Sequence, residues 1–248
     1  MASASHRGHP VHIALVESML DTAGLDESAL QCPEAWPLSP DAARRLHLAG
    51  QSRPRQIWHN CSGKHAGFLR ACVGSGWPVD SYLSPEHPLQ KQIIAFVSEL
   101  GENPVEPVGV DGCGAPVLRT TARAMSLLFA RLACDPSLRE VFESMHRYPS
   151  LIASNGEGDS NIAMAINAAA KGGAQGCIGV AVEGRLGMAV KSWDGSGDIA
   201  DVGAVAALDE LEELTPTARS ALAGTARPAV LGGGTRVGET TPRLELTR

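Results

Sequence analysis

Hydrophobic side chains recur at a helical spacing through most of this chain. Across residues 12–25, apolar positions such as Val16 and Leu20 fall on one helix face, and Gly24 is placed to cap the helix. The remaining helical segments predicted from the pattern are residues 41–50, 63–77, 87–101, 120–133, 136–153, 161–170, 201–214 and 217–224. The chain is therefore expected to be rich in helix.

Three shorter apolar runs predict strands instead. Residues 104–110 end in an apolar run that indicates a buried strand, and the glycine-rich turn at 111–116 follows it. Residues 177–183 and 186–193 form two strand-like runs that predict a hairpin. The chain ends in polar residues, so we expect a poorly ordered tail over 232–248. Because no repeat or boundary interrupts these elements, one α+β domain over the whole chain is the simplest prediction.

Composition narrows the class of protein. Of the 248 residues, 44% are hydrophobic and 19% charged, which is typical of a soluble globular protein. The net charge of −6 argues against a nucleic-acid or anionic-membrane binder. No apolar run spans a bilayer and no signal peptide is evident, so we expect a cytoplasmic protein. Thiols, metal ligands or core residues are then better interpretations than disulfides for Cys32, Cys61, Cys72, Cys113, Cys134 and Cys177.

The densest chemistry lies in residues 59–67, "HNCSGKHAG". If Ser62 begins a helix, Cys61 lies at its N-terminus, where free N–H groups stabilise a thiolate or an anionic ligand. Lys64 and His65 project from the same first turn. A buried cysteine beside a solvated lysine is the plainer alternative, but the coincidence of residue types favours a functional site.

A second cluster, "DGCGAP" at residues 111–116, strengthens that interpretation. Asp111 and Cys113 lie in a glycine-flanked turn after the predicted strand, although Asp-Gly is also a common turn pair. Cys61 and Cys113 are suited to share a zinc ion with an open coordination position. The nitrogen donors that the sequence offers for that ion are His59, His65 and Lys64.

Lys191 lies within the second apolar run of the predicted hairpin. A lysine in an apolar strand must be paired or neutral, and a neutral lysine can take a proton from a serine hydroxyl. The alternative is an edge strand that points the ammonium into water. A two-residue loop of Gly184 and Arg185 would place Ile178 opposite Lys191, so pairing with Cys177 would need a longer loop.

Further hydroxyls lie at the start of the chain, in "SASHRGH". Ser3 and Ser5 are flanked there by His6 and His9. From the pattern alone, this segment is interpreted as a frayed terminus.

Together these segments resemble the bacterial type II L-asparaginase family, which has a serine β-lactamase-like fold. The resemblance runs from Ser3 to about Leu214 and implies an antiparallel sheet flanked by helices, an α/β sandwich. In the family, a pair of strands and a Ser-x-x-Lys motif precede the serine-histidine loop, whereas only Met1 and Ala2 precede it here, so we expect a truncated form lacking N-terminal strands. The matching segments, in family order, are "SASHRGHPVH", "HNCSGKHAGF", "HPLQKQI", "VGVDGCGAP", "AKGGAQGCIGVAV" and "GMAVKSWDG".

The resemblance also implies an activity and a site. Such enzymes hydrolyse L-asparagine to L-aspartate and ammonia through lysine-activated serines, contain zinc and form homodimers. One serine–lysine pair would be Ser5 and Lys191. The implied zinc ligands are Cys61, Lys64 and Cys113. The residues implied to line the substrate pocket are His65, Asp111 and Gly112, with Cys177 near them.

Two other functions fit parts of the sequence. The chain departs from the family pattern at His9, Ser154 and Gln175, and it lacks the upstream motif, so a non-catalytic zinc- or asparagine-binding remnant is one alternative. A cysteine amidohydrolase using Cys61 with a neighbouring histidine is another, but it leaves Lys191 unexplained.

Overall fold

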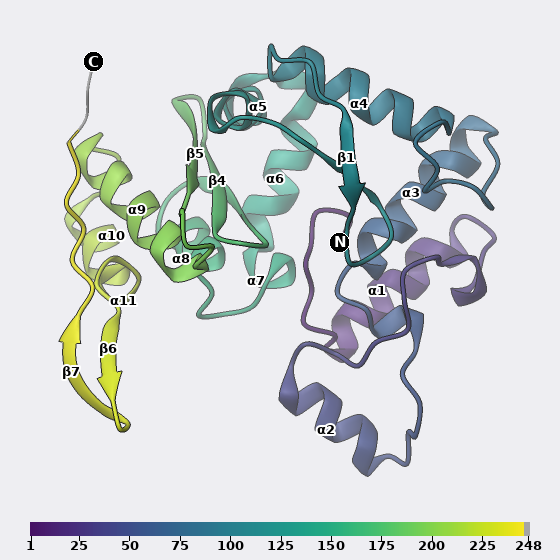
Figure 1. The fold of residues 1–248 in the computed structure, drawn as a ribbon, viewed down its shortest axis with the longest axis horizontal. Coiled ribbons are helices and arrows are strands. Elements are labelled where there is room, and N and C mark those ends of the chain that lie inside the picture. Colours follow the sequence, from purple (N-terminus) through teal and green to yellow (C-terminus); the bar gives the residue numbers. More distant parts are fainter. Residues whose placement is uncertain (246–248) are drawn as a thin grey trace. The chain divides into compact units, whose positions relative to one another are not determined.

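A computed structural model describes residues 1–245 of the chain. It comprises two compact units, and each is described by itself (Figure 1). Unit 1 is Met1–Thr120 with Leu151–Ser154, and unit 2 is Thr121–Ser150 with the residues from Asn155 onward. Both units combine helices with small antiparallel sheets, which confirms the predicted α+β class.

Unit 1 is built mainly of helices, and all four of its longer helices lie where the hydrophobic spacing predicts them. Its elements are α1 (Pro10–Asp21), α2 (Pro40–Leu48), α3 (Ser62–Ser75), α4 (Pro88–Leu100), β1 (Pro107–Val110) and β2 (Pro116–Leu118), with short 3-10 turns at Glu27–Ala29 and Gln56–Trp58. Three of the helices begin with proline, whose fixed φ suits a first helical position. Gly76, at a φ of 68°, ends α3 in the left-handed conformation.

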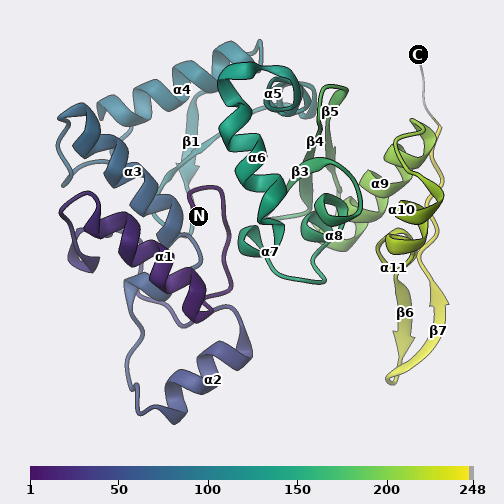
Figure 2. The same cartoon turned by 180° about the vertical axis from the view of Figure 1, so that it is seen from behind.

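The core of unit 1 gathers around α1 and α3, which lie side by side (Figures 1 and 2). Val16 and Leu20 of α1 and Leu69 of α3 are fully or almost fully buried in it. The start of the chain lies against α3 at two glycines. A Cβ at Gly63 would come within 2.8 Å of the Met1 carbonyl oxygen, and one at Gly67 within 2.8 Å of Ala2 Cβ. Small residues on α3 therefore let the N-terminal segment approach it closely.

The prediction of a buried strand over 104–110 is wrong. All four residues of β1 are exposed, with Val108 and Val110 at 52% and 74% of their full accessibility. Within residues 1–245, β1 pairs with β2 alone, as an antiparallel hairpin. A short apolar run cannot by itself distinguish a buried central strand from one arm of a two-stranded hairpin.

Unit 2 holds the remaining elements, and the short helix α7 (Pro149–Ile152) lies at the boundary. Its helices are α5 (Ala122–Cys134), α6 (Arg139–Arg147), α8 (Gly158–Ala165), α9 (Gly197–Glu210), α10 (Pro216–Ala221) and α11 (Ala223–Ala226), with a 3-10 turn at Pro136–Leu138. Its strands are β3 (Ala168–Gly173), β4 (Cys177–Val182), β5 (Leu186–Lys191), β6 (Ala229–Gly232) and β7 (Thr235–Glu239). Among the described residues, we find no helix with both the length and the apolar character that a membrane span requires.

Three strands of unit 2 were not predicted. β3 begins in the alanine run that the sequence assigns to a helix over 161–170, β6 follows the last predicted helix, and β7 lies in the predicted tail. The last residues of that tail, 246–248, lie outside the described residues. Alanine favours helix in isolation, so pairing with β4 decides the conformation of this run.

The main sheet of unit 2 has the order β3-β4-β5, all antiparallel, with helices on both faces (Figure 2). Ile178 and Val180 of β4 belong to the buried cluster that includes residues of α9. Gly179 faces the other way, because successive side chains on a strand alternate. A Cβ there would overlap Phe129 of α5 at 1.9 Å, and one at Gly187 would overlap the Ala130 backbone at 1.9 Å. Glycine on this face therefore allows α5 to pack directly on the sheet.

The β4–β5 hairpin differs from its prediction by one residue in the loop. Val182 pairs with Leu186, so the three residues 183–185 form the connection, and Cys177 pairs directly with Lys191. The prediction of a two-residue loop is wrong, and the longer loop changes which side chains share a face. Gly184 supplies a φ of 64° within that turn.

Candidate functional site

Two thiols that lie 52 positions apart in the sequence meet in unit 1. Cys61 is the N-cap residue of α3, as the sequence predicts, and Cys113 lies in the loop between β1 and β2. Ligand atoms of Cys61, Asp111 and Cys113 all lie within 4.8 Å of one another. We call these three residues, with Lys64, the thiol cluster.

The loop that carries Cys113 is closed by backbone hydrogen bonds. Asp111 N–H donates to the Ala115 carbonyl at 2.8 Å, and Gly114 N–H donates to the Asp111 carbonyl at 2.8 Å. Gly114 has a φ of 89°, which a residue with a side chain rarely adopts, whereas Gly112 has no such conformation. The turn buries Cys113 and leaves the Asp111 side chain 46% exposed, so the carboxylate reaches solvent from the edge of the cluster.

Lys64 adds a cation to the thiol cluster. Its Nζ lies 3.1 Å from Cys113 Sγ and 3.7 Å from Asp111 Oδ2. Burial opposes the charged form, but the thiols of Cys61 and Cys113 and the Asp111 carboxylate outweigh it and raise the pKa of Lys64 above its usual range. In the absence of a metal ion, Lys64 is therefore an ammonium that balances the negative charge beside it.

The two thiols share a proton unequally. A hydrogen bond from Cys61 is the main cause that lowers the pKa of Cys113, and the same bond raises the pKa of Cys61. Cys113 is thus the thiolate and Cys61 the thiol that donates to it. Cys113 Sγ also lies 3.2 Å from Asp111 Oδ2, and two anionic atoms that close need a cation beside them.

The donor set fits zinc. Two sulfurs with a lysine nitrogen or a carboxylate oxygen match the softness and the number of ligands that Zn²⁺ takes in proteins. Of the three nitrogen donors that the sequence left open, Lys64 lies with its Nζ at hydrogen-bonding distance from a cluster sulfur, 3.1 Å from Cys113 Sγ. His59 uses Nδ1 to accept the Cys61 N–H at 3.0 Å. The position of Asp111 in the cluster was not foreseen, since the resemblance implies a substrate-binding role for it.

We expect zinc binding to strengthen steeply with pH. The raised pKa values of Lys64 and Cys61 keep both groups protonated near neutral pH, and both must lose a proton to become ligands, whereas Cys113 is already a thiolate. Release of two protons makes the apparent Kd fall by about 100-fold per pH unit. Competition with a chromophoric chelator between pH 6 and 8 measures this slope.

The same titration has a matched control for its lysine contribution. Lys64→Met should reduce the slope to about one proton, while Lys91→Met, at an exposed lysine paired with Glu86, should leave it unchanged. A wild-type affinity independent of pH would contradict the assignment of protons.

The interpretation of the first residues as a frayed terminus is wrong, because they are anchored in unit 1. Ser5 N–H donates to the Ile152 carbonyl at 2.9 Å, and His6 N–H donates to the Asn60 carbonyl at 3.1 Å. The His6 ring is fully buried, with Nε2 2.8 Å from Ser62 Oγ, and burial lowers its pKa to about 3. A neutral His6 therefore ties the segment that carries Ser5 to the start of α3.

The two predicted site residues of unit 2 lie on neighbouring strands. Cys177 is half-buried on β4, and Lys191, opposite it, is the last residue of the edge strand β5 with an exposed side chain. Exposure is the alternative that the sequence left open for Lys191. Because Ser5 belongs to unit 1 and Lys191 to unit 2, the serine–lysine pair stays a prediction.

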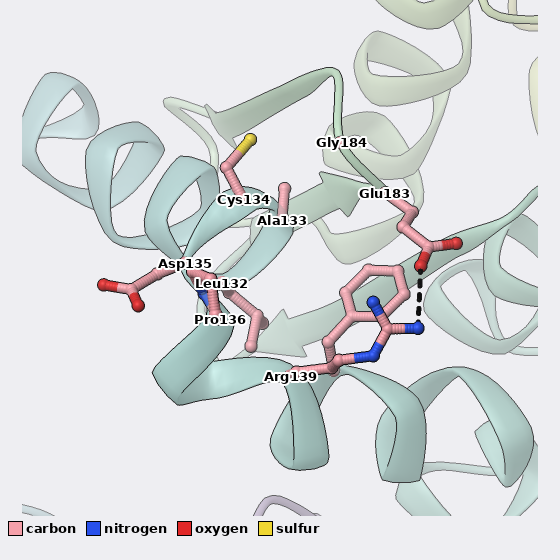
Figure 3. A pocket seen from close by; sticks show the side chains of 9 residues that line it. Leu132, Ala133, Cys134, Asp135, Pro136, Arg139, Glu183 and Gly184 are labelled. Atoms are coloured by element: carbon pink, nitrogen blue, oxygen red, sulfur yellow. Dashed lines mark ion pairs between the residues drawn. The ribbon is translucent and has the colours of Figure 1, made fainter.

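Unit 2 also carries a surface pocket of about 390 Å³, apart from every predicted site residue (Figure 3). Arg139 points across it toward Glu183, with Nη2 3.8 Å from the carboxylate. Its walls are Leu132, Ala133, Cys134, Asp135, Pro136, Arg139, Phe142, Glu183 and Gly184. The pocket has an exposed thiol at Cys134, and its Glu183 carboxylate is paired with Arg139, so we assign it no chemistry.

Sequence reasoning missed one buried polar residue near the thiol cluster, Tyr82, whose hydroxyl contacts His65 at 2.7 Å. Ser62, which the sequence places at the helix start, donates its hydroxyl to the Ile57 carbonyl at 2.8 Å while it contacts His6. The one signal for Tyr82 was its rarity, because the chain has two tyrosines and 4% aromatic residues.

The protein is thus an α+β protein. It carries a candidate zinc site of two thiols, a lysine and a carboxylate at the start of α3. A model of the family described as L-asparaginase II matches residues 1–242. The chain belongs to that family and is an L-asparaginase-type hydrolase, which confirms the resemblance. A search of curated proteins gave no match.

Proposed function

We propose that this protein hydrolyses the side-chain amide of L-asparagine, giving L-aspartate and ammonia. The observation that carries the proposal is the family match over residues 1–242, which includes both the Ser5 segment and the thiol cluster. A cytoplasmic location, a homodimer and a serine β-lactamase-like arrangement of the fold are parts of the same proposal.

In the proposed reaction, Ser5 is the nucleophile and Lys191 its base. The side-chain amine of Lys191 takes the hydroxyl proton of Ser5 while the oxygen attacks the amide carbon. The proton passes to the leaving nitrogen, the carbon–nitrogen bond breaks, and ammonia departs from an acyl-ester on Ser5. Water then hydrolyses the ester to L-aspartate. The anchoring of residues 5 and 6 supports this role, because a nucleophile must be held in place.

We propose that Cys61, Lys64 and Cys113 hold zinc and that nearby residues line the substrate site. When bound, zinc supplies positive charge next to the substrate. Asp111 offers a partly exposed carboxylate for the substrate ammonium, and the first N–H groups of α3 suit its carboxylate. The other residues proposed to line the site are His65, Gly112 and Cys177.

The geometry weighs against a cysteine amidohydrolase. A raised pKa makes Cys61 a poor nucleophile, and its proton is donated to Cys113 instead of a base. The Nδ1 atoms of His59 and His65 are engaged by the Cys61 N–H and Tyr82 hydroxyl. Neither Nδ1 atom is free to activate the Cys61 thiol.

Ammonia release from L-asparagine by the purified protein, with and without added zinc, tests the proposed function. We expect turnover of L-asparagine, and L-glutamine tested in parallel defines the preference between the two amides. Binding of L-asparagine without any ammonia at saturating substrate would favour the non-catalytic alternative, a zinc- or asparagine-binding remnant.

A further inference from the structure

A backbone turn separates Ser5 from α1. Ala4 and His6, on either side of Ser5, are buried, whereas Ser5 itself is half-buried. The turn that follows is made at Gly8, which has a φ of 75°, a conformation that residues with side chains rarely adopt. α1 begins two residues later, at Pro10. The backbone at Gly8 therefore sets the path of the Ser5 segment relative to α1.

A chain of hydrogen bonds joins this turn to the start of α3. The Gly8 N–H lies 3.2 Å from Nδ1 of His6, and because a backbone N–H can only donate, Nδ1 is the acceptor. The neutral ring then carries its proton on Nε2, which donates to Ser62 Oγ at 2.8 Å. The Ser62 hydroxyl donates in turn to the Ile57 carbonyl at 2.8 Å. The buried His6 ring thus holds the Gly8 backbone in place.

A second contact of the turn is with Pro37, in the connection between α1 and α2. We call residues 35–39 of that connection the Pro37 segment. Pro37 is buried, and a Cβ placed on Gly8 would lie 2.6 Å from Pro37 Cβ and 3.0 Å from Pro37 Cα. Ser39 N–H also donates to the Arg7 carbonyl at 3.0 Å. The Pro37 segment therefore packs directly on the turn and leaves no room there for a side chain.

The Pro37 segment is itself held by the rest of unit 1. The backbone of Ala35 forms an antiparallel bridge with Arg55, in which the Ala35 N–H donates at 3.2 Å. The Trp36 ring stacks on the buried Trp58 ring, with centroids 5.3 Å apart. A proline ring also cannot rotate away as a flexible side chain can. A methyl group added at Gly8 would therefore displace the turn more readily than the Pro37 segment.

We propose that Gly8 is a positioning residue for the nucleophile, because it lets the Pro37 segment pack against the turn that places Ser5. The inference rests on the proposed function in one respect, that Ser5 is the nucleophile. The His6 ring and the Pro37 segment together hold the turn, so the Ser5 hydroxyl is presented at one position. A nucleophile displaced by about 1 Å loses much of its rate, even when the change lies away from the reacting atoms.

The test compares Gly8→Ala with Gly24→Ala. Gly24, just after α1, has a similar φ of 68°, and among the described residues nothing beyond its chain neighbours lies within 4 Å of a Cβ placed on it. Gly24→Ala therefore introduces the backbone strain without the contact. We expect kcat for ammonia release to fall about 10²-fold in Gly8→Ala, with KM for L-asparagine within about twofold of the wild type. In Gly24→Ala both constants should stay within about twofold of the wild type.

A second substitution separates the contact from the strain. Adding Pro37→Gly to Gly8→Ala removes the ring that the new methyl group meets and should raise kcat again by about 10-fold. Adding Pro33→Gly, at an exposed proline of the same connection, should not. If Gly8→Ala does not fold, Pro37→Gly and Pro33→Gly are compared as single variants, and kcat should be about 10-fold lower in the former. Equal effects of the two proline substitutions would contradict the contact.

Hydrogen exchange tests the inference independently of the proposed function. The backbone N–H groups of Ser5 and His6 both donate to carbonyl oxygens of unit 1, so their exchange rates report how firmly the segment is held. Exchange should be about 10-fold faster in Gly8→Ala than in Gly24→Ala. If the wild type released no ammonia, the proposed function would fail and these rates would decide whether Gly8 positions the segment. Wild-type kcat in Gly8→Ala, or equal exchange in the two glycine variants, would overturn the inference.

Discussion

Replacement of Ser5 by alanine should abolish ammonia release from L-asparagine, with kcat lower by at least about 10³-fold. Ser5 is the proposed nucleophile, and its loss removes the atom that forms the acyl-ester. The fold should be unaffected, because the described hydrogen bond of Ser5 is made by its backbone N–H and not by its hydroxyl. Initial rates of ammonia release at saturating L-asparagine measure the effect.

Two other variants distinguish loss of the nucleophile from other causes of low activity. Ser3→Ala changes an exposed hydroxyl two residues away and should leave kcat within about twofold of the wild type. Cys61→Ala should act mainly through zinc affinity, and added zinc should partly restore the rate. Complete loss of activity in Cys61→Ala together with full activity in Ser5→Ala would instead support a cysteine nucleophile.

Local signals in the sequence predicted the helices correctly, but they failed for strands whose conformation and burial depend on pairing with other segments. The helical spacing and the glycines after it placed α1 to α4 correctly. The alanines of β3 carry a helix preference that only hydrogen bonding to β4 overrides. The exposed run of β1 resembled a core strand, because hydrophobicity records residue type and not the neighbours that cover it.

In the β4–β5 hairpin, one residue of loop length is the only difference between the predicted register and the observed one. Two loop residues or three are equally compatible with the glycine at 184, yet the choice determines whether Cys177 or Ile178 lies opposite Lys191. The sequence left this question open, and the observed register brings the two predicted site residues together on adjacent strands.

The two sulfur ligands of the thiol cluster could be predicted from the sequence, but the contacts of the residues around them could not. Cys61 and Cys113 were paired from residue type and from the turns around them, and the structure brings them together. The contact between Tyr82 and His65 joins positions 17 apart with no motif between them. Tyr82 lies near the cluster only because the loop that carries it packs against α3. The residues that could bind the metal are therefore easier to predict from sequence than the residues that orient them.

Replacement of Cys113 by alanine should remove zinc binding, lowering affinity by more than about 10³-fold, beyond the 10- to 100-fold typical of outer-shell partners. Cys113 is the thiolate of the thiol cluster, and Cys61, Lys64 and Asp111 all contact it. Cys134→Ala, which removes an exposed thiol in unit 2, is the matched control and should bind zinc as the wild type does. Competition with a chelator, followed by metal analysis of the dialysed protein, gives both values.

Variants of Lys64 and Asp111 then show which of the two side chains is the third zinc ligand. Both lie near Cys113 Sγ, Lys64 Nζ at 3.1 Å and Asp111 Oδ2 at 3.2 Å, so distance alone does not separate them. If Lys64 is the third ligand, Lys64→Met should approach the effect of Cys113→Ala, whereas Asp111→Asn should cost about 10-fold or less in zinc affinity and mainly raise KM for L-asparagine. The reverse order would make Asp111 the ligand and would leave Lys64 as the ammonium that balances the thiolate.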